Sequence, residues 1–358
     1  MLQFIIRRLL LLLPVMIGIV LVTFIIVRAI PGDPCKAMLG ERATEVKCDA
    51  FRERYGLNDN VFVQFGRYLV SMAQGEFGNS IRFTRPVTDM IAERLPMTIE
   101  LTIGAMLFST VVGILLGVIS ALKRNTIIDT VTMMIANVGV SMPVFWLGLM
   151  LAYVFALLLR DTPFFLEPSA RLSSGVTLTP LIKLWGMEEA EGLKKFSVYF
   201  LSNSLLWNSV ITGNWEPFIN GLKHLILPSV AVGTIPMAIT ARMTRSSLLE
   251  VLGLDYIRTA RAKGLPYGRV ITKHAMSNAM IPIVTILGIE VGSLLSGAVL
   301  TETVFALPGV GTALVTAILG RDYPVVQGFT VVIAIIFILV NLIVDVSYAY
   351  LDPRIRLE

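Results

Sequence analysis

The sequence predicts an all-α integral membrane protein that crosses the bilayer six times. Of its 358 residues, 55% are hydrophobic and only 15% are charged, and the mean hydropathy is +0.76. A soluble domain carries about 25% charged residues, so this chain has too few charges to cover a water-facing surface. Six long apolar runs without period-2 alternation favour helices over the strands of a membrane barrel.

The apolar runs have lengths close to the roughly 20 residues that a bilayer core requires. The third run is interrupted by Pro143, the fourth contains Pro228 and Pro236, and the fifth contains one acid, Glu290. In chain order the predicted spans are residues 9–27, 101–122, 130–159, 225–241, 275–300 and 323–344.

The first run has a second interpretation. Arg7 and Arg8 followed by leucines are also typical of a secretory signal peptide. The apolar stretch is too long for the core of such a peptide, and no small-residue cleavage site follows it. We therefore expect an uncleaved first span.

Basic residues set the orientation, because cytoplasmic loops of membrane proteins are enriched in lysine and arginine. Residues 242–274 carry seven basic side chains against two acidic ones. By contrast, residues 31–95 carry nine of each kind, and residues 161–223 carry five basic and six acidic ones. The basic segments are predicted to be cytoplasmic, which places both termini in the cytoplasm and two sizeable loops outside.

This orientation gives a three-part organisation. Residues 1–30 hold the N-terminal cytoplasmic stretch and the first span, and residues 31–96 form an extracytoplasmic loop. Residues 97–358 form a core of five further spans. That core includes the outer loop 161–223 and the cytoplasmic segment 242–274.

Both cysteines of the chain, Cys35 and Cys48, fall in the first outer loop. An oxidising compartment preserves disulfides, so we favour a bond between them, worth about 3 kcal/mol in the chain-entropy model. Two unpaired thiols in a reducing setting are the alternative. A zinc site is disfavoured because two thiols without a nearby histidine supply half of a ligand set.

Two further segments of the outer loops have helical character. Residues 56–69 are amphipathic, and we expect a helix capped near Asn58. Residues 196–211 are apolar but broken by serines and asparagines, and they are short for a span. We interpret them as an interfacial or cavity-lining helix, because a crossing here would make the span count odd.

The cytoplasmic segment between the fourth and fifth spans contains a predicted helical turn. Asp255 can cap a short helix over residues 256–263. Gly264 can end that helix in the left-handed conformation, and Pro266 prevents its continuation. Two short arginine-rich helices of this kind could dock into a groove of a soluble partner. An ordinary positively charged loop is the alternative.

The same segment, DYIRTARAKGLPYGRVITKHAMSNAMIP, resembles the EAA-type coupling motif of ABC importer permeases, most closely the dipeptide, oligopeptide and nickel branch. Further matches follow in family order: FIIRRLLLLLPVMIGIVLVTFIIVRAIPGDP, RLPMTIELT, PVFWLGL, HLILPSVAVG, LSGAVLTETVFALPGVG and VSYAYLDPRIR. The resemblance assigns ATPase coupling to Asp255, Tyr256, Arg258, Thr259, Ala260, Arg261, Lys263, Gly264, Pro266 and His274. The second outer loop, residues 167–220, is longer than we expect for this family.

The resemblance implies a type I ABC importer permease of the prokaryotic plasma (inner) membrane, transporting peptides or a related small solute. It also implies the partners: a second, similar permease subunit, two ABC ATPase subunits that bind ATP and Mg, and an extracytoplasmic substrate-binding protein. No cofactor is expected on this chain, and no nucleic-acid partner. The alternative function is a secondary transporter or channel that works alone.

The residues themselves offer no catalytic chemistry. A G-x-x-x-x-G-K-[ST] phosphate loop is absent, and the two histidines, His224 and His274, form no metal-binding motif. We therefore expect neither a catalytic residue nor a metal site, and any ATP hydrolysis belongs to partner chains.

Glu290 is the one candidate for the solute pathway, since an acid at membrane depth usually faces a cavity or a partner. A buried carboxyl satisfied by neighbouring helices is an equal alternative. The G-x-x-x-G spacings at 113 and 117 and at 288 and 292 favour close helix packing. Glu302, at the outer end of the fifth span, is expected to need no partner beyond water.

Overall fold

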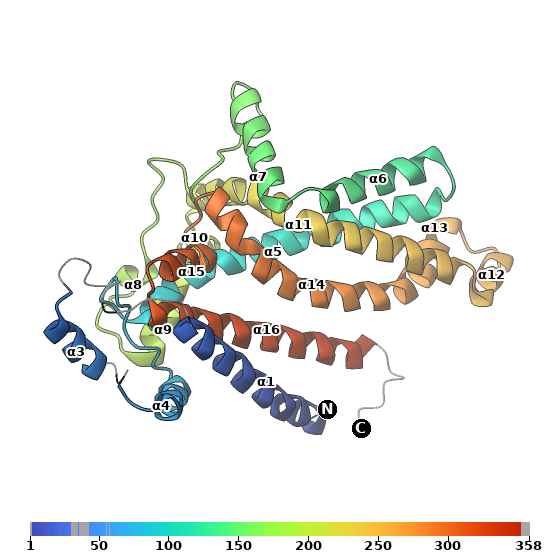
Figure 1. The fold of residues 1–358 in the computed structure, drawn as a ribbon. Coiled ribbons are helices and arrows are strands. Elements are labelled where there is room, and N and C mark those ends of the chain that lie inside the picture. Colours follow the sequence, from blue (N-terminus) through green and yellow to red (C-terminus); the bar gives the residue numbers. More distant parts are fainter. Residues whose placement is uncertain (1, 30–34, 36–42, 55, 57, 352–358) are drawn as a thin grey trace.

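The chain folds into a bundle of long helices with smaller helices at its two ends (Figure 1). The structure is a computed structural model and describes residues 2–29, 35, 43–54, 56 and 58–351. Within these residues the regular elements are all helical: α1 Leu2–Ala29, α3 Glu45–Arg54, α4 Val61–Ala73, α5 Val87–Leu122, α6 Ile127–Ser141, α7 Val144–Ala152, the π-helical η2 Tyr153–Leu158, α8 Leu181–Leu184, α9 Gly192–Asn203, α10 Leu205–Thr212, α11 Trp215–Leu252, α12 Asp255–Ala262, α13 Tyr267–Arg269, the π-helical η3 Val270–Ala275, α14 Met276–Val304, α15 Val310–Leu319 and α16 Tyr323–Leu351.

Within the described residues, four helical segments are long and apolar enough to cross a membrane: Val87–Leu122, Trp215–Leu252, Tyr267–Leu294 and Tyr323–Val344. A fifth is obtained if α6 and the α7–η2 segment count as one span. In α1, the apolar stretch Leu10–Ile26 is shorter. The all-helical membrane class is confirmed, whereas the count of six stays a prediction.

The predicted third span, residues 130–159, is not one straight helix. The chain bends by 106° between α6 and α7. The bend falls at Met142 and Pro143, where Pro143 caps α7 and disfavours helical geometry in the residue before it. As a result α7 projects from the side of the bundle (Figure 1).

Prolines elsewhere do not interrupt helices. Pro228 and Pro236 lie inside α11, which at 38 residues extends well beyond the predicted fourth span on both sides. Pro96 lies inside α5, which starts at Val87 rather than at residue 101. Neighbouring helices can satisfy the backbone groups that a proline frees, so membrane helices tolerate it.

The centre of the bundle is the pair α5 and α11, which pack along much of their length. Gly113 and Gly117 make this possible. A Cβ atom at Gly113 would lie 2.8 Å from the carbonyl oxygen of Met237, and one at Gly117 would lie 2.6 Å from that of Ala241. The predicted close packing at this G-x-x-x-G spacing is therefore confirmed.

The second G-x-x-x-G pair packs against α16. Ideal Cβ atoms on Gly288 and Gly292 would meet the side chains of Val344 and Phe337, respectively. Close packing is thus confirmed here as well. At the far edge of the bundle, α16 also runs beside α1 (Figure 1).

The first outer loop contains a disulfide between Cys35 and Cys48, whose Cα atoms are 5.4 Å apart. Both cysteines are buried together with Ile81. The following helix, α4, begins later than predicted. Its N-cap is Asn60, two residues after the predicted position near Asn58, and the Asn60 side chain accepts a hydrogen bond from the backbone N–H of Phe62 at 2.9 Å.

The apolar part of the second outer loop, residues 196–211, forms parts of two helices. α9 and α10 meet at Ser204, whose extended backbone breaks the helix. α9 packs on the outer part of α5, where Phe196 and Phe200 contact the core cluster around Phe329. The segment is therefore folded onto the bundle as a helical pair.

Two buried carboxylates bind outer loops to the bundle. Glu100 of α5 accepts hydrogen bonds from Arg171 at 2.6 Å and from the hydroxyl of Ser204 at 3.0 Å. Asp322, just before α16, accepts one from Ser80 at 2.5 Å and two more from backbone N–H groups of the first outer loop. Each acid thus joins segments that are far apart in sequence.

Glu302 makes a third connection of this kind, and the expectation that water would suffice as its partner was wrong. Its side chain is fully buried. One oxygen accepts a hydrogen bond from the Thr98 hydroxyl at 2.6 Å, and the other accepts one from the backbone N–H of Thr312 at 3.1 Å. Thr98 in turn accepts one from the backbone N–H of Val310 at 2.9 Å, so the carboxylate fixes the start of α15.

We expect Glu302→Ala to destabilise the protein by about 1–3 kcal/mol for each buried donor left without an acceptor. The measurement is thermal unfolding of the purified protein in detergent, together with proteolysis of the segment between α14 and α15. Glu188→Ala, at an exposed acid of the second outer loop, is the control and should leave the unfolding midpoint nearly unchanged. Equal midpoints for the two variants would contradict the structural role of Glu302.

Candidate functional site

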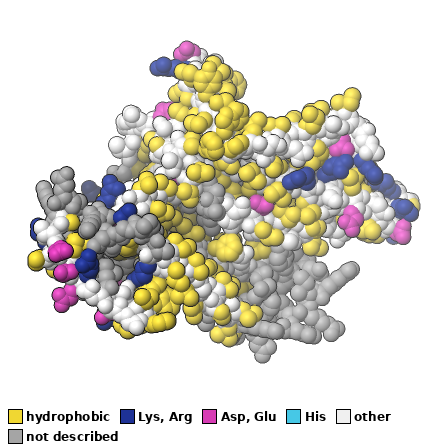
Figure 2. Space-filling view, viewed as in Figure 1, with side chains coloured by type: hydrophobic (Ala, Val, Ile, Leu, Met, Phe, Trp, Pro, Cys, Tyr) yellow, Lys and Arg dark blue, Asp and Glu magenta, His cyan; other side chains and the backbone are white. Residues whose placement is uncertain are grey.

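The candidate site is the elbow, defined here as residues 253–275, the segment predicted to be cytoplasmic. It comprises α12, the turn after it, α13 and η3, and it projects at one end of the bundle (Figure 1). Basic side chains gather at this end of the molecule, whereas a largely hydrophobic surface covers the middle (Figure 2). The elbow therefore presents a charged knob beyond the apolar part of the bundle.

Apolar side chains anchor the elbow to the helix ends beneath it. Ile257 of α12 and Val270 of η3 are fully buried. They form one cluster with Ala121 of α5, Leu248 of α11 and Ala279 of α14. A displacement of the elbow therefore moves the ends of three long helices, because close-packed interiors transmit strain.

The start of the elbow differs from the sequence prediction. The N-cap of α12 is Leu254, without a side-chain capping bond, and Asp255 is the first helical residue. The Asp255 carboxylate instead lies 3.3 Å from the Arg258 guanidinium, and its backbone carbonyl accepts a hydrogen bond from Thr259 at 3.0 Å. A carboxylate in the first helical turn still favours the helix through the macrodipole.

The turn after α12 agrees with the prediction. Gly264 has a φ of +75°, the left-handed conformation that glycine adopts without strain. Pro266 follows as the N-cap of α13. An ideal Cβ atom on Gly264 meets nothing within 4 Å, so a side chain there would point away from this chain.

Ala260 differs from Gly264 in the direction it faces. It is 8% exposed and packs inward with Ile257, so its small size serves the attachment of the elbow to the bundle. The exposed surface of the elbow carries aromatic and apolar side chains beside the charges. Exposed residues of the elbow include Leu254, Asp255, Tyr256, Arg258, Thr259, Arg261, Lys263, Pro266, Tyr267, Arg269, Thr272 and Lys273.

Polar contacts fold α12 back onto the start of α14. The hydroxyl of Tyr256 donates a hydrogen bond to the carbonyl of His274 at 3.3 Å and accepts one from Asn278 at 2.7 Å. The guanidinium of Arg261 lies 5.7 Å from the centre of the Tyr267 ring, within range of a cation–π interaction. Together with the buried cluster, these contacts hold α12 against η3 and the start of α14.

The sequence reasoning missed an ion pair beside the elbow, between a buried carboxylate and a partly exposed guanidinium. Asp129 of α6 accepts hydrogen bonds from Nε and Nη2 of Arg245 on α11, both at 2.9 Å. The available signal was the Thr-x-x-Asp spacing of Thr126 and Asp129, a capping-box pattern. This spacing predicts that a helix starts after Thr126, and the Thr126 side chain does cap α6. That pattern does not reveal the partner on α11.

Glu290 lies inside this chain and not on an open surface. It is 7% exposed and belongs to the buried stripe of α14 that includes Leu287 and Leu294. Leu294 packs against Ala105 of α5 and Val232 of α11. Among the described residues, none donates a hydrogen bond to the Glu290 carboxyl. Glu290 therefore lies within the helix bundle, as the prediction of an acid inside the fifth span requires. In this conformation its side chain packs among helices of this chain and does not face an open pathway.

The two histidines lie far apart, His224 near the start of α11 and His274 in η3, just before α14. His224 is buried, with Nε2 at 3.0 Å from a carboxylate oxygen of Glu167 and Nδ1 at 2.9 Å from the carbonyl of Asn220. The pKa of Glu167 is lowered, first by the hydrogen bond from the Ser173 hydroxyl and then by that from His224. Over the described residues, no group of three His, Cys, Asp or Glu side chains could hold a metal ion.

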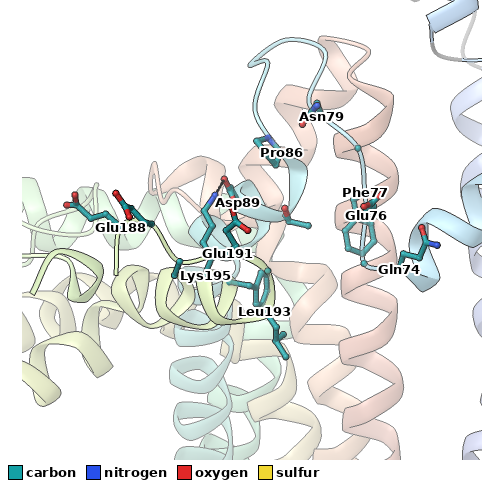
Figure 3. A pocket seen from close by; sticks show the side chains of 17 residues that line it. Gln74, Glu76, Phe77, Asn79, Pro86, Asp89, Glu188, Glu191, Leu193 and Lys195 are labelled. Atoms are coloured by element: carbon teal, nitrogen blue, oxygen red, sulfur yellow. Dashed lines mark hydrogen bonds and ion pairs between the residues drawn. The ribbon is translucent and has the colours of Figure 1, made fainter. Parts of the chain in front are cut away.

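At the end of the bundle away from the elbow, a cavity of about 990 Å³ lies between the end of α4 and the start of α9 (Figure 3). Its lining is acidic, with Glu76, Asp89, Glu188 and Glu191 around it. Lys195 also lines the cavity and donates a hydrogen bond to Asp89 at 2.8 Å. A surface of this charge attracts cationic groups.

Comparison with known proteins gives a family. Residues 113–357 match the family described as "Binding-protein-dependent transport system inner membrane component". Residues 1–102 match "Binding-prot-dependent transport system membrane comp, N-term". Together the two matches cover nearly the whole chain, in agreement with the ordered motifs found in the sequence.

Curated relatives agree over their full length. The chain is 46% identical to the "Dipeptide transport system permease protein DppB" of Alkalihalophilus pseudofirmus over 99% of this chain and 100% of the relative. It is 44% identical to the Escherichia coli K12 protein of the same name and 36% identical to the "Oligopeptide transport system permease protein AppB" of Bacillus subtilis, with 99% of both chains covered in each case. Since these chains are nearly equal in length, the second outer loop does not make this protein longer than these relatives.

Proposed function

Because this chain belongs to the family of binding-protein-dependent transport system inner membrane components, we propose that it is the membrane-spanning permease subunit of an ATP-driven ABC importer of peptides. It is a multi-pass protein of the bacterial plasma membrane. The names of the relatives, which specify dipeptides and oligopeptides, support peptides as the substrate class.

In the proposed complex this chain contacts four kinds of partner. A second, similar permease subunit completes the translocation pathway, and two ABC ATPase subunits bind ATP and Mg on the cytoplasmic side. An extracytoplasmic binding protein delivers the peptide to the outer loops, and lipid surrounds the spans. Six spans with both termini in the cytoplasm fit the basic charge of the elbow and place the disulfide of Cys35 and Cys48 outside.

The observation that carries the coupling role is the anchoring of the elbow. Ile257 and Val270 connect it to the ends of α5, α11 and α14, while Tyr256, Arg258, Arg261 and other polar side chains remain exposed. Closure of an ATPase dimer against the exposed face would therefore displace helix ends, and nucleotide binding would favour one of two helix packings. Glu290 is our candidate for a group that contacts the pathway in the other packing.

The test is reconstitution of the purified complex in proteoliposomes with its binding protein. We expect uptake of a labelled dipeptide that requires ATP, and co-purification of ABC ATPase chains with the tagged permease. Uptake by this chain alone, driven by an ion gradient and without ATP, would establish the stand-alone transporter instead. No feature of the described residues favours that second function, because Glu290 is a single acid without an ionisable partner at its depth.

A further inference from the structure

The helix α6 is joined to the rest of the bundle through small side chains and one ion pair. Its buried stripe consists of Asp129, Thr132, Ala136 and Gly139. Ala136 packs with Ala238 and Ala241 of α11, a contact between methyl groups. Further along the same stripe, the Thr234 side chain of α11 packs against Gly139, so α6 and α11 are in close contact there as well. Asp129 is the one position of this stripe at which a charged side chain joins α6 to α11.

Asp129 is the only charged residue of α6, and the protein surrounds it with donors. Arg245 contacts both of its oxygens at 2.9 Å. Ser120 of α5 donates a third hydrogen bond, and the backbone N–H of Asn125 donates a fourth at 3.0 Å. Asn125 holds a φ of +60°, an uncommon conformation for a residue other than glycine, so the short loop before α6 is shaped around this carboxylate.

Arg245 lies on the part of α11 that leads directly into the elbow. It precedes the end of α11 at Leu252 by about two helical turns, and all three prolines of α11 lie further upstream. Leu248 and Val251, between Arg245 and the elbow, belong to the cluster that anchors Ile257. A displacement of the elbow consequently moves Arg245 with it.

At its other end α6 leads into α7, which reaches the outer side of the bundle. Gly148 of α7 lies against Phe305, the residue that follows α14, with an ideal Cβ atom 3.0 Å from the Phe305 ring. Leu151 and Ala152 pack on the same cluster as Phe305 and Leu307. A movement of α6 is therefore passed to side chains near the outer loops.

We propose that the ion pair of Asp129 and Arg245 is the link that carries a movement of the elbow to α6 and α7. Both residues are positioning residues: they act on the pathway through α6 and contact neither ATP nor peptide. Removing Arg245 leaves the buried Asp129 carboxylate without its charged partner, so the link is lost more completely than by loss of an exposed pair. This inference rests on the proposed function as an ATP-driven permease.

The experiment uses the complete complex in proteoliposomes and measures ATP hydrolysis and dipeptide uptake on the same preparation. For Asp129→Asn and Arg245→Gln we expect the peptides moved per ATP hydrolysed to fall at least tenfold, while the ATPase chains still co-purify. Arg245→Lys keeps the charge and should recover most of the ratio. Lys123→Gln removes an exposed cation from the loop between α5 and α6. This variant should move as many peptides per ATP as the unaltered protein does.

The possible outcomes distinguish failure of the ion-pair link from failure of the proposed function. An unchanged ratio in Asp129→Asn and Arg245→Gln overturns the link. Loss of assembly in all three pair variants, Arg245→Lys included, also overturns it by assigning the pair to folding. If the unaltered complex shows no ATP-dependent uptake, the proposed function itself fails, before any variant is compared.

Discussion

Replacing Gly264 by tryptophan should reduce ATP-dependent peptide uptake by at least about 30-fold, the loss expected when a docking contact worth 2 kcal/mol is removed. The exposed turn at Gly264 has room within this chain for a side chain, since nothing lies within 4 Å of an ideal Cβ atom. The indole would therefore project toward the ATPase subunit and hold the elbow out of its groove. The measurement is uptake in proteoliposomes together with the amount of ATPase chain that co-purifies.

A matched control removes the effect of backbone strain. Any L-residue at a positive φ costs about 1–2 kcal/mol, so Gly264→Trp includes this cost as well. Gly186 has a φ of +61° and equally open surroundings, but it lies in the second outer loop. Gly186→Trp carries the same strain and should retain nearly normal uptake. Equal losses in both variants would mean that strain, and not docking, explains the result.

Replacing Gly117 by valine should destabilise the bundle by about 3 kcal/mol or more, because the added atoms meet backbone. An ideal Cβ atom at Gly117 already lies 2.5 Å from the Cβ atom of Thr244 and 2.6 Å from the carbonyl oxygen of Ala241. α5 and α11 would have to move apart, and the elbow cluster at their ends would separate with them. We expect a low yield of the complex and a reduced midpoint of thermal unfolding in detergent.

The control for this variant is another glycine inside a long apolar helix. Gly18 of α1 has nothing within 4 Å of an ideal Cβ atom. Gly18→Val makes the same chemical change and should alter stability by no more than about 0.5 kcal/mol. A midpoint for Gly117→Val equal to that for Gly18→Val would show that α5 and α11 are not in close contact.

The sequence predicted those features that depend on local chemistry. Runs of apolar residues identified the long helices, the Gly264–Pro266 spacing identified the end of α12, and the two G-x-x-x-G spacings identified close helix packing. In each case the residues that decide the structure are neighbours along the chain. The family resemblance, which the comparisons confirm, added a function that composition and spacing alone do not contain.

Features that depend on distant residues were missed. The sequence shows that Pro143 interrupts the third run, but it does not show that the chain bends there by 106°, since prolines inside α11 and α5 cause no comparable break. Glu302 was assigned to water because its partners, Thr98 and Thr312, come from other elements. Asp129 was not singled out at all, because its partner Arg245 lies 116 residues away.

The outer carboxylates also have a consequence for the order in which the protein is made. Thr98 and Ser80 emerge from the ribosome 204 and 242 residues before Glu302 and Asp322, the acids that they contact. The segments around Thr98 and Ser80 therefore lack these hydrogen bonds while the middle of the chain is synthesised. The bonds form only after the acids at the end of α14 and just before α16 have been made. A chain that stops after α11 should expose these segments to proteases added from outside, whereas the completed chain should resist the same treatment.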